Sequence, residues 1–158
     1  MTFTDSTFYP DTSPGYLVRL IHQMNVAAID RTLADDDLTA TQWTTLVSLH
    51  FGHADTCIGL ARKLGHDKGA MTRLIDQMEA KGWLSRQRDD EDRRVIRLTL
   101  TEAGTQKAIA AKRKVIACWN GMLAGWSDAE VADLIATLQR LRRTMEEKMA
   151  EESDPCAA

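Results

Sequence analysis

The chain has 158 residues, and 44% of them are hydrophobic, which supports a folded core and excludes an intrinsically disordered chain. Its formal net charge of −3 gives no overall sign of a polyanionic partner. The charge is unevenly distributed, however: residues 57–101 contain ten Lys/Arg and seven Asp/Glu, whereas the rest of the chain contains ten and sixteen. A basic middle between acidic ends fits one surface that binds a polyanion.

The three cysteines, Cys57, Cys118 and Cys156, are widely spaced and include no C-x-x-C pair. This pattern argues against a disulfide framework and a structural zinc site, and it is compatible with a reducing cytoplasm. The first residues lack the basic and apolar regions of a secretory signal. No apolar run approaches the roughly 20 residues that span a bilayer. We therefore expect a cytoplasmic protein with no membrane partner.

The first third of the chain shows two helical patterns. Residues 1–14 are rich in Thr, Ser, Asp and Pro, which predicts a loose arm. Apolar residues then recur at helical spacing from residue 16 to about residue 34, where three consecutive aspartates interrupt the pattern. Thr39 and Gln42 form a capping box, which predicts a second helix from residue 40 to about residue 50. Gly52 is expected to stop this helix.

The middle of the chain predicts a helix-turn-helix. A short helix is expected over residues 57–64, with Asp55 or Thr56 as its cap, and a longer one over residues 68–81, capped by Asp67. Only Gly65-His66-Asp67 joins them. A tight turn containing glycine, between a short helix and a longer one with a basic start, is typical of this motif.

A hairpin and two long helices follow. Residues 83–88 and 95–100 flank the acidic run of residues 89–92, and Ile96, Leu98 and Leu100 alternate with polar or smaller side chains. This period of two predicts a hairpin with one buried face, placed as the wing after a helix-turn-helix. Thr101 is expected to cap a helix to about residue 123. A second capping box at residues 127–130 then opens a last helix to about residue 149.

The order of these elements, with four quoted segments, resembles the MarR/SlyA family of winged-helix transcription regulators. The segments are LTATQW (38–43), CIGLARKLG (57–65), DKGAMTRLIDQMEAKGWLSRQR (67–88) and DDEDRRVIRLTLTEAG (89–104). The last is the most specific, although Asp90 stands where the family's wing pattern has proline. The resemblance covers about residues 15–150.

The resemblance implies a mainly α fold with a small two- or three-stranded antiparallel wing. It implies one MarR-type domain over residues 1–158, in which about 38–101 bind DNA and about 15–37 and 102–150 are dimerisation helices. The implied function is a ligand-responsive repressor that binds a near-palindromic double-stranded DNA operator as a homodimer. No cofactor, metal or enzymatic activity is expected.

The expected DNA contacts lie on the longer helix and the wing. A helix enters the major groove, where Thr72 and Arg73 match the family's reading positions and Lys68 is expected to contact a phosphate. Arg94, by family match, is expected to enter the minor groove, with Asp92 holding its guanidinium before DNA arrives. Three further wing arginines are expected near phosphates: Arg86, Arg88 and Arg93. The alternative for each charged side chain is an ordinary solvated surface.

Proteins that resemble this chain commonly respond to small aromatic or anionic molecules. Arg19, His22, Trp43 and Trp119 have suitable chemistry and lie on elements expected to border the effector space. The alternative for each is core packing with a satisfied polar tip.

Four rival functions make different demands on the sequence. A metal sensor is suggested by His50, His53, Cys57 and His66, but Gly52 interrupts the helix between the first two histidines. A thiol sensor through Cys57 or Cys118 needs an accessible, positive environment. An enzyme is disfavoured because consecutive acids at a hairpin tip diverge, and no nucleophile or phosphate-binding motif is present. A winged-helix protein-interaction module without DNA binding is the strongest rival, and it predicts no steep salt dependence.

Overall fold

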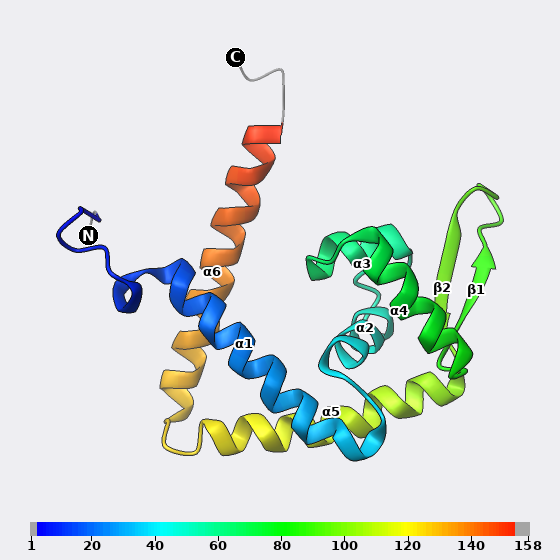
Figure 1. The fold of residues 1–158 in the computed structure, drawn as a ribbon, viewed down its shortest axis with the longest axis horizontal. Coiled ribbons are helices and arrows are strands. Elements are labelled where there is room, and N and C mark those ends of the chain that lie inside the picture. Colours follow the sequence, from blue (N-terminus) through cyan, green and yellow to red (C-terminus); the bar gives the residue numbers. More distant parts are fainter. Residues whose placement is uncertain (1–2, 154–158) are drawn as a thin grey trace. The chain divides into compact units, whose positions relative to one another are not determined.

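A computed structural model describes residues 3–153 of the chain. The chain divides into two compact units, Met1–Cys118 and Trp119–Ala158. In chain order the elements are η1 (Pro10–Thr12), α1 (Pro14–Leu33), η2 (Ala34–Asp36), α2 (Ala40–His50), α3 (Cys57–Leu64), α4 (Lys68–Ala80), β1 (Leu84–Arg88), β2 (Ile96–Leu100), α5 (Glu102–Met122) and α6 (Asp128–Ser153) (Figure 1). Cys156 lies outside the described residues.

The N-terminal segment is shorter and more ordered than the expected loose arm. Thr and Ser side chains hydrogen-bond within residues 4–12, and the rings of Phe3 and Phe8 meet edge to face with centroids 5.3 Å apart. Ser13 caps helix α1 through the backbone N–H of Tyr16. The predicted helix is confirmed, but only its end is buried, through Ile29 and Leu33.

The helix-turn-helix forms as predicted. The capping box of Thr39 and Gln42 opens α2, Thr56 rather than Asp55 caps α3, and Asp67 caps α4. Gly65 ends α3 at φ +68°, a left-handed conformation that costs little only for glycine. The buried side chains of α4 are Met71, Ile75 and Met78. They belong to one hydrophobic core with buried residues of the neighbouring elements, among them Leu46, Leu60 and Leu84.

The wing is a two-stranded antiparallel sheet in which Leu84 pairs with Leu100 and Arg88 with Ile96. Leu98 is buried, but Ile96 is 49% exposed, so the predicted buried face was wrong at this residue. Ile96 lies at the turn end of the hairpin, opposite the exposed Arg88. In the middle of β2, the Leu98 backbone N–H donates to the Asp55 carbonyl at 2.7 Å, which ties the wing to the loop before α3.

The start of α5 packs closely on the base of the wing. Thr101 caps it through the Gly104 N–H at 3.0 Å and donates its own hydroxyl to the Gly82 carbonyl at 2.6 Å. A Cβ added at Gly104 would lie 1.8 Å from the Trp83 carbonyl oxygen, so only glycine fits there.

In the second unit, Ser127 and Glu130 form the predicted capping box at the start of α6. Four large apolar side chains follow along α6 at helical spacing, and all are exposed: Ile135, Leu138, Leu141 and Met145. Among residues 3–153, no helix is both long and apolar enough to cross a membrane.

Candidate nucleic-acid interface

Helix α4 presents the predicted reading residues to solvent. Lys68, Thr72 and Arg73 are exposed, whereas Met71 and Ile75 on the opposite face are buried. The Thr72 hydroxyl donates to the Lys68 carbonyl at 2.8 Å. It also lies 3.5 Å from the sulfur of Cys57 on α3. The Thr72 hydroxyl therefore contacts both its own helix and α3.

The wing tip presents Arg94 outward. Its side chain is 92% exposed, and its Nε donates to Asp92 Oδ1 at 3.2 Å. The same carboxylate oxygen accepts the Arg94 backbone N–H at 3.0 Å. The expected Asp92–Arg94 pair is therefore present, with Asp92 holding both the backbone and the guanidinium of Arg94.

Asp89 organises the turn of the wing, a role that the sequence reading missed. Its Oδ1 accepts the backbone N–H groups of Glu91 and Asp92 at 3.0 and 2.9 Å, and its Oδ2 pairs with Arg97. The Asp92 N–H, followed by Arg97, holds the pKa of Asp89 below its ordinary value. An aspartate at the first position of a turn is a known signal for this arrangement, and it was available in the sequence.

Arg97 is a second residue that the sequence reading missed. Its guanidinium pairs with Asp89 at the turn and with Asp55 in the loop before α3. The sequence contained only a weak signal, an arginine on the wetter face of an alternating strand. Its partner Asp55 lies 42 residues earlier, and only the folded chain brings the two together.

The Arg86 guanidinium, which was expected near a DNA phosphate, binds two acids of α4. Its Nη1 and Nη2 bind Glu79 and Asp76 of α4, each at 2.5 Å. The guanidinium therefore bridges the wing to α4 and neutralises two acids beside the reading face.

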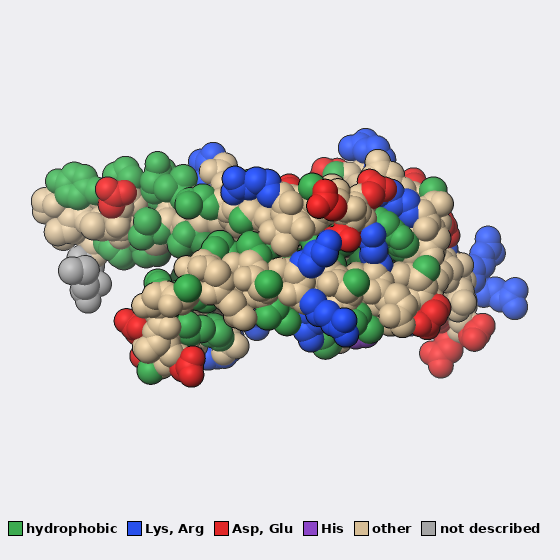
Figure 2. Space-filling view, turned by 90° about the horizontal axis from the view of Figure 1, so that it is seen from below, with side chains coloured by type: hydrophobic (Ala, Val, Ile, Leu, Met, Phe, Trp, Pro, Cys, Tyr) green, Lys and Arg blue, Asp and Glu red, His purple; other side chains and the backbone are tan. Residues whose placement is uncertain are grey.

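Arg88 and Arg93 are exposed, and neither forms an ion pair with any residue in the described part of the chain. At the right edge of Figure 2, where the wing lies, Lys and Arg side chains project beside acidic ones. The arginines at this end of the wing are therefore available to an anionic partner.

Lysines of α5 and of the turn after α4 bind the acidic segment at η2. Lys114 binds the Asp36 carboxylate at 2.6 Å, and Lys107 donates to the Asp36 carbonyl at 2.5 Å. Lys81 binds Asp37 at 2.8 Å. Lys81 also lies over the Trp83 ring, 4.6 Å from its centroid. Asp36 and Asp37 of the acidic run, predicted only as a helix break, thus anchor two lysines of α5 and one in the turn after α4.

The expected effector residues are placed on three helices. Arg19 and His22 are exposed on α1, and Trp43 is half-buried on α2. The Trp43 indole Nε1 and the Asn25 Oδ1 are buried without a hydrogen-bond partner among residues 3–153. Trp119 is 37% exposed on α5, in the second unit. Two unsatisfied polar atoms on the adjoining helices α1 and α2 are the strongest feature here, because burial without a partner is costly.

The histidines and cysteines of the metal- and thiol-sensor hypotheses lie on different segments of the chain. His50 ends α2, and Gly52 at φ +66° turns the chain before His53, as the sequence predicted. The described residues contain no group of three His, Cys, Asp or Glu side chains placed to hold a metal ion. Cys57 and Cys118 are both free and half-buried.

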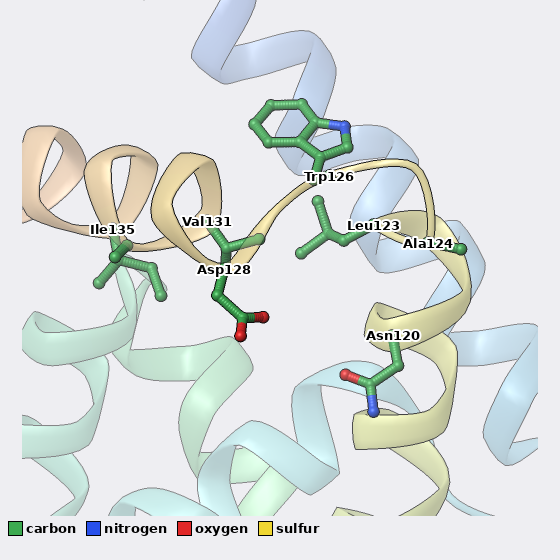
Figure 3. A pocket seen from close by; sticks show the side chains of 8 residues that line it. Asn120, Leu123, Ala124, Trp126, Asp128, Val131 and Ile135 are labelled. Carbon is green, nitrogen blue, oxygen red and sulfur yellow. The ribbon is translucent and has the colours of Figure 1, made fainter.

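An open pocket of about 410 Å³ lies at the α5–α6 turn of the second unit. Figure 3 shows Leu123 and Val131 pointing toward each other from the two sides of this turn. Asn120, Trp126 and Asp128 also line the pocket. Sequence reasoning did not predict it, because its walls form only when the turn closes.

A helix-turn-helix followed by a two-stranded wing, with exposed basic side chains on both, defines a winged-helix protein of the nucleic-acid-binding class. Residues 38–96 match the model of the MarR family. The resemblance predicted from the sequence is confirmed by this match, and the chain has the mainly α winged-helix fold that the resemblance implies.

Three solved structures show the same fold. MarR from E. coli, as a cysteine-to-serine mutant complexed with operator DNA, is 26% identical over 80% of this chain and 91% of its own, with a TM-score of 0.71. A MarR-family transcriptional regulator from Rhodococcus sp. RHA1 is 25% identical over 80% and 91%, with a TM-score of 0.72. BpsR from Bordetella bronchiseptica, whose DNA binding is regulated by 6-hydroxynicotinic acid, is 23% identical over 85% and 96%, with a TM-score of 0.73.

Proposed function

We propose that this chain is a sequence-specific, double-stranded DNA-binding transcriptional regulator and not an enzyme. We propose further that it is a ligand-responsive repressor that binds a near-palindromic operator as a homodimer. The observation that carries the proposal is Arg94, exposed at the wing tip and held by Asp92. An ordinary solvated ion pair would not require Arg94 to be held at the wing tip, since exposed ion pairs contribute only about 0–1 kcal/mol to stability.

The proposed contacts divide between two grooves. Thr72 and Arg73 of α4 read base edges in the major groove, and Lys68 contacts a phosphate near the start of the helix. Arg94 enters the minor groove, where narrow A·T-rich DNA concentrates negative potential. Arg88 and Arg93 contact phosphates. Arg86 acts through the wing–α4 bridge, because both its Nη atoms are occupied by acids.

The proposed homodimer rests on the apolar surface of the helices outside the winged helix. Ile135, Leu138 and Met145 on α6 are each about half exposed, and a second copy would remove them from water. Two-fold symmetry then places two reading helices about one DNA turn, roughly 34–36 Å, apart.

The proposed effector is a small aromatic or anionic molecule. The unsatisfied Trp43 N–H and Asn25 carbonyl support a ligand with both a donor and an acceptor. Arg19 or His22 would recognise an acidic group. The regulation of BpsR by an aromatic acid makes such acids the first compounds to test.

The pair of Arg94 and Asp92 gives the first prediction. Arg94→Ala should weaken operator binding by about 1–3 kcal/mol, because the minor-groove contact is lost. Asp92→Ala should also weaken binding, although it removes a negative charge near DNA, since the free guanidinium must then be ordered on binding. Binding is measured by gel shift against DNA flanking the chain's own coding region, with and without aromatic acids.

The control is Arg113→Ala, which removes the same charge from an exposed position of α5 and should leave affinity unchanged. Circular dichroism and size-exclusion chromatography show whether each variant stays folded and associated. Normal affinity for Arg94→Ala at matched salt would contradict the wing assignment. Binding that tightened in Asp92→Ala would replace the holding role with simple repulsion. A wild-type affinity independent of salt would favour a protein-interaction module instead.

A further inference from the structure

We propose that Arg97 is a positioning residue for DNA recognition, which fixes the wing tip to the loop before α3 and thereby sets where Arg94 is presented. This inference rests on the proposed DNA-binding function. Arg97 does not contact DNA in this proposal; it acts through Asp89 and Asp55.

The first step is the bridge made by the Arg97 guanidinium. Its Nε binds Asp89 at the wing turn and its Nη1 binds Asp55 before α3. The Arg97 side chain is 48% exposed. Because two different nitrogens of one planar group are held by two fixed carboxylates, the bridge defines an orientation and not only a distance.

The second step leads from Asp89 to Arg94. The Asp89 oxygen that does not bind Arg97 accepts the N–H groups of Glu91 and Asp92. Asp92 in turn accepts the backbone N–H and the Nε of Arg94. Each link is a hydrogen bond to a carboxylate, so a displacement of Asp89 shifts the turn that carries Arg94.

The third step is the anchor at the other end. The Asp55 carbonyl accepts the Leu98 N–H at 2.7 Å, and Asp55 immediately precedes the residue that caps α3. Helix α3 packs on α4, which carries the predicted reading residues. A two-stranded hairpin is marginally stable alone, so this anchor places the wing in the same frame as the reading helix.

The charges around Arg97 favour a positioning role over direct contact with DNA. Arg97 forms ion pairs with two carboxylates, whereas Arg88 and Arg93 form an ion pair with none of the described residues. A guanidinium already neutralised by two acids adds little counterion release on DNA binding. Loss of Arg97 should therefore lower affinity without changing how affinity depends on salt.

The test compares Arg97→Gln and Arg97→Lys in the full-length chain, in the wild-type and Arg94→Ala backgrounds, by operator titration over a salt series. Arg97→Gln should weaken binding roughly five- to thirtyfold, which lies within the range of coupling between residues that act together. Arg97→Lys should recover part of the loss through one retained ion pair. In the Arg94→Ala background, measured at low salt so that weak binding is detectable, Arg97→Gln should have little further effect.

Asp55→Asn provides a second variant, because it removes the anchor and leaves Arg97 in place. It should weaken operator binding in the wild-type background and, like Arg97→Gln, should have little effect once Arg94 is absent. Arg93→Gln is the matched control: it should reduce the slope of log affinity against log salt by about 1, whereas Arg97→Gln should leave the slope unchanged.

Three results would overturn the proposal. Unchanged affinity in Arg97→Gln would show that the bridge does not position Arg94. If the affinity lost in Arg97→Gln simply added to that lost in Arg94→Ala, Arg97 would act independently of Arg94 or on the whole fold. If Arg97→Gln reduced the slope of log affinity against log salt, Arg97 would contact a phosphate directly. If the wild-type chain itself binds no DNA, the proposed function fails, which is distinguishable from a normal wild type with an unaffected Arg97→Gln variant.

Discussion

At the scale of the residue, the four consecutive acids of the wing have different environments. Asp89 has a side chain only 13% exposed and organises the turn, whereas Asp90 and Glu91 are exposed at its tip. Asp92 holds Arg94. The sequence predicted the role of Asp92 from its spacing to Arg94. The inward position of Asp89 depends on Arg97, which only the paired strand brings within reach.

The pKa of Asp89 gives the prediction at this scale. Because its folded-state pKa lies below the ordinary 3.8, its contribution to turn stability is present above pH 3.8 and is lost as the pH falls through the lowered value. Carbon-13 NMR of the carboxyl group should show Asp89 titrating below 3.8. Arg97→Gln should raise its pKa toward, but not to, the ordinary value, because the backbone N–H donors remain.

Arg93→Gln is the control for this titration, since Arg93 lies one to four residues from the same acids but pairs with none of them in the described structure. It should shift the pKa of Asp89 much less than Arg97→Gln does. A titration of Asp89 at or above its ordinary value in the wild type would show that the turn hydrogen bonds do not persist in solution.

At the scale of the element, the local sequence predicted where the helices begin, but it did not predict which strand side chains are buried. Thr39, Asp67, Thr101 and Ser127 all cap the helices predicted from them, because a cap satisfies backbone groups two or three residues away. Ile96 had the alternation of a buried strand and is exposed. Strand alternation separates two faces, but only neighbouring elements decide how far along the strand one face is covered.

The close contact at the start of α5 gives the prediction at this scale. Gly104→Ala should destabilise the chain by about 1–3 kcal/mol, the usual cost of overpacking, because the new Cβ would overlap the Trp83 carbonyl. Thermal unfolding followed by circular dichroism measures the effect. Gly121→Ala, in the same helix with nothing within 4 Å of the added Cβ, should not lower the melting temperature. Equal melting temperatures for wild type and Gly104→Ala would contradict the contact.

At the scale of the whole molecule, a second copy is the proposed cover for the exposed apolar face of α6. Leu138→Asp should shift the chain toward monomer, because burying a charge without a partner costs several kcal/mol. Light scattering coupled to size-exclusion chromatography measures the mass. Ala136→Asp places the same charge on the opposite face of α6 and should leave the mass unchanged. A Leu138→Asp variant with the wild-type mass would exclude this face from the dimer.

DNA binding should follow association at this scale. A monomeric Leu138→Asp variant retains one winged helix, so it loses the paired half-site contacts and should lose affinity for a palindromic operator more than for a half-site. An operator affinity that survives in a monomer would argue against the homodimer as the binding species.

The sequence by itself determined the element order, the helix caps, the helix-turn-helix, the position of the wing and the pairing of Asp92 with Arg94. These features depend on residues within a few positions of one another, where chemistry and spacing are sufficient. Only the tertiary structure decided that Arg97 joins Asp55 to Asp89, that Arg86 binds α4, and that Asp36 and Asp37 hold lysines from distant segments. Such ion pairs join surface charges far apart in the chain, and any exposed charge has many possible partners until the backbone places one of them within reach.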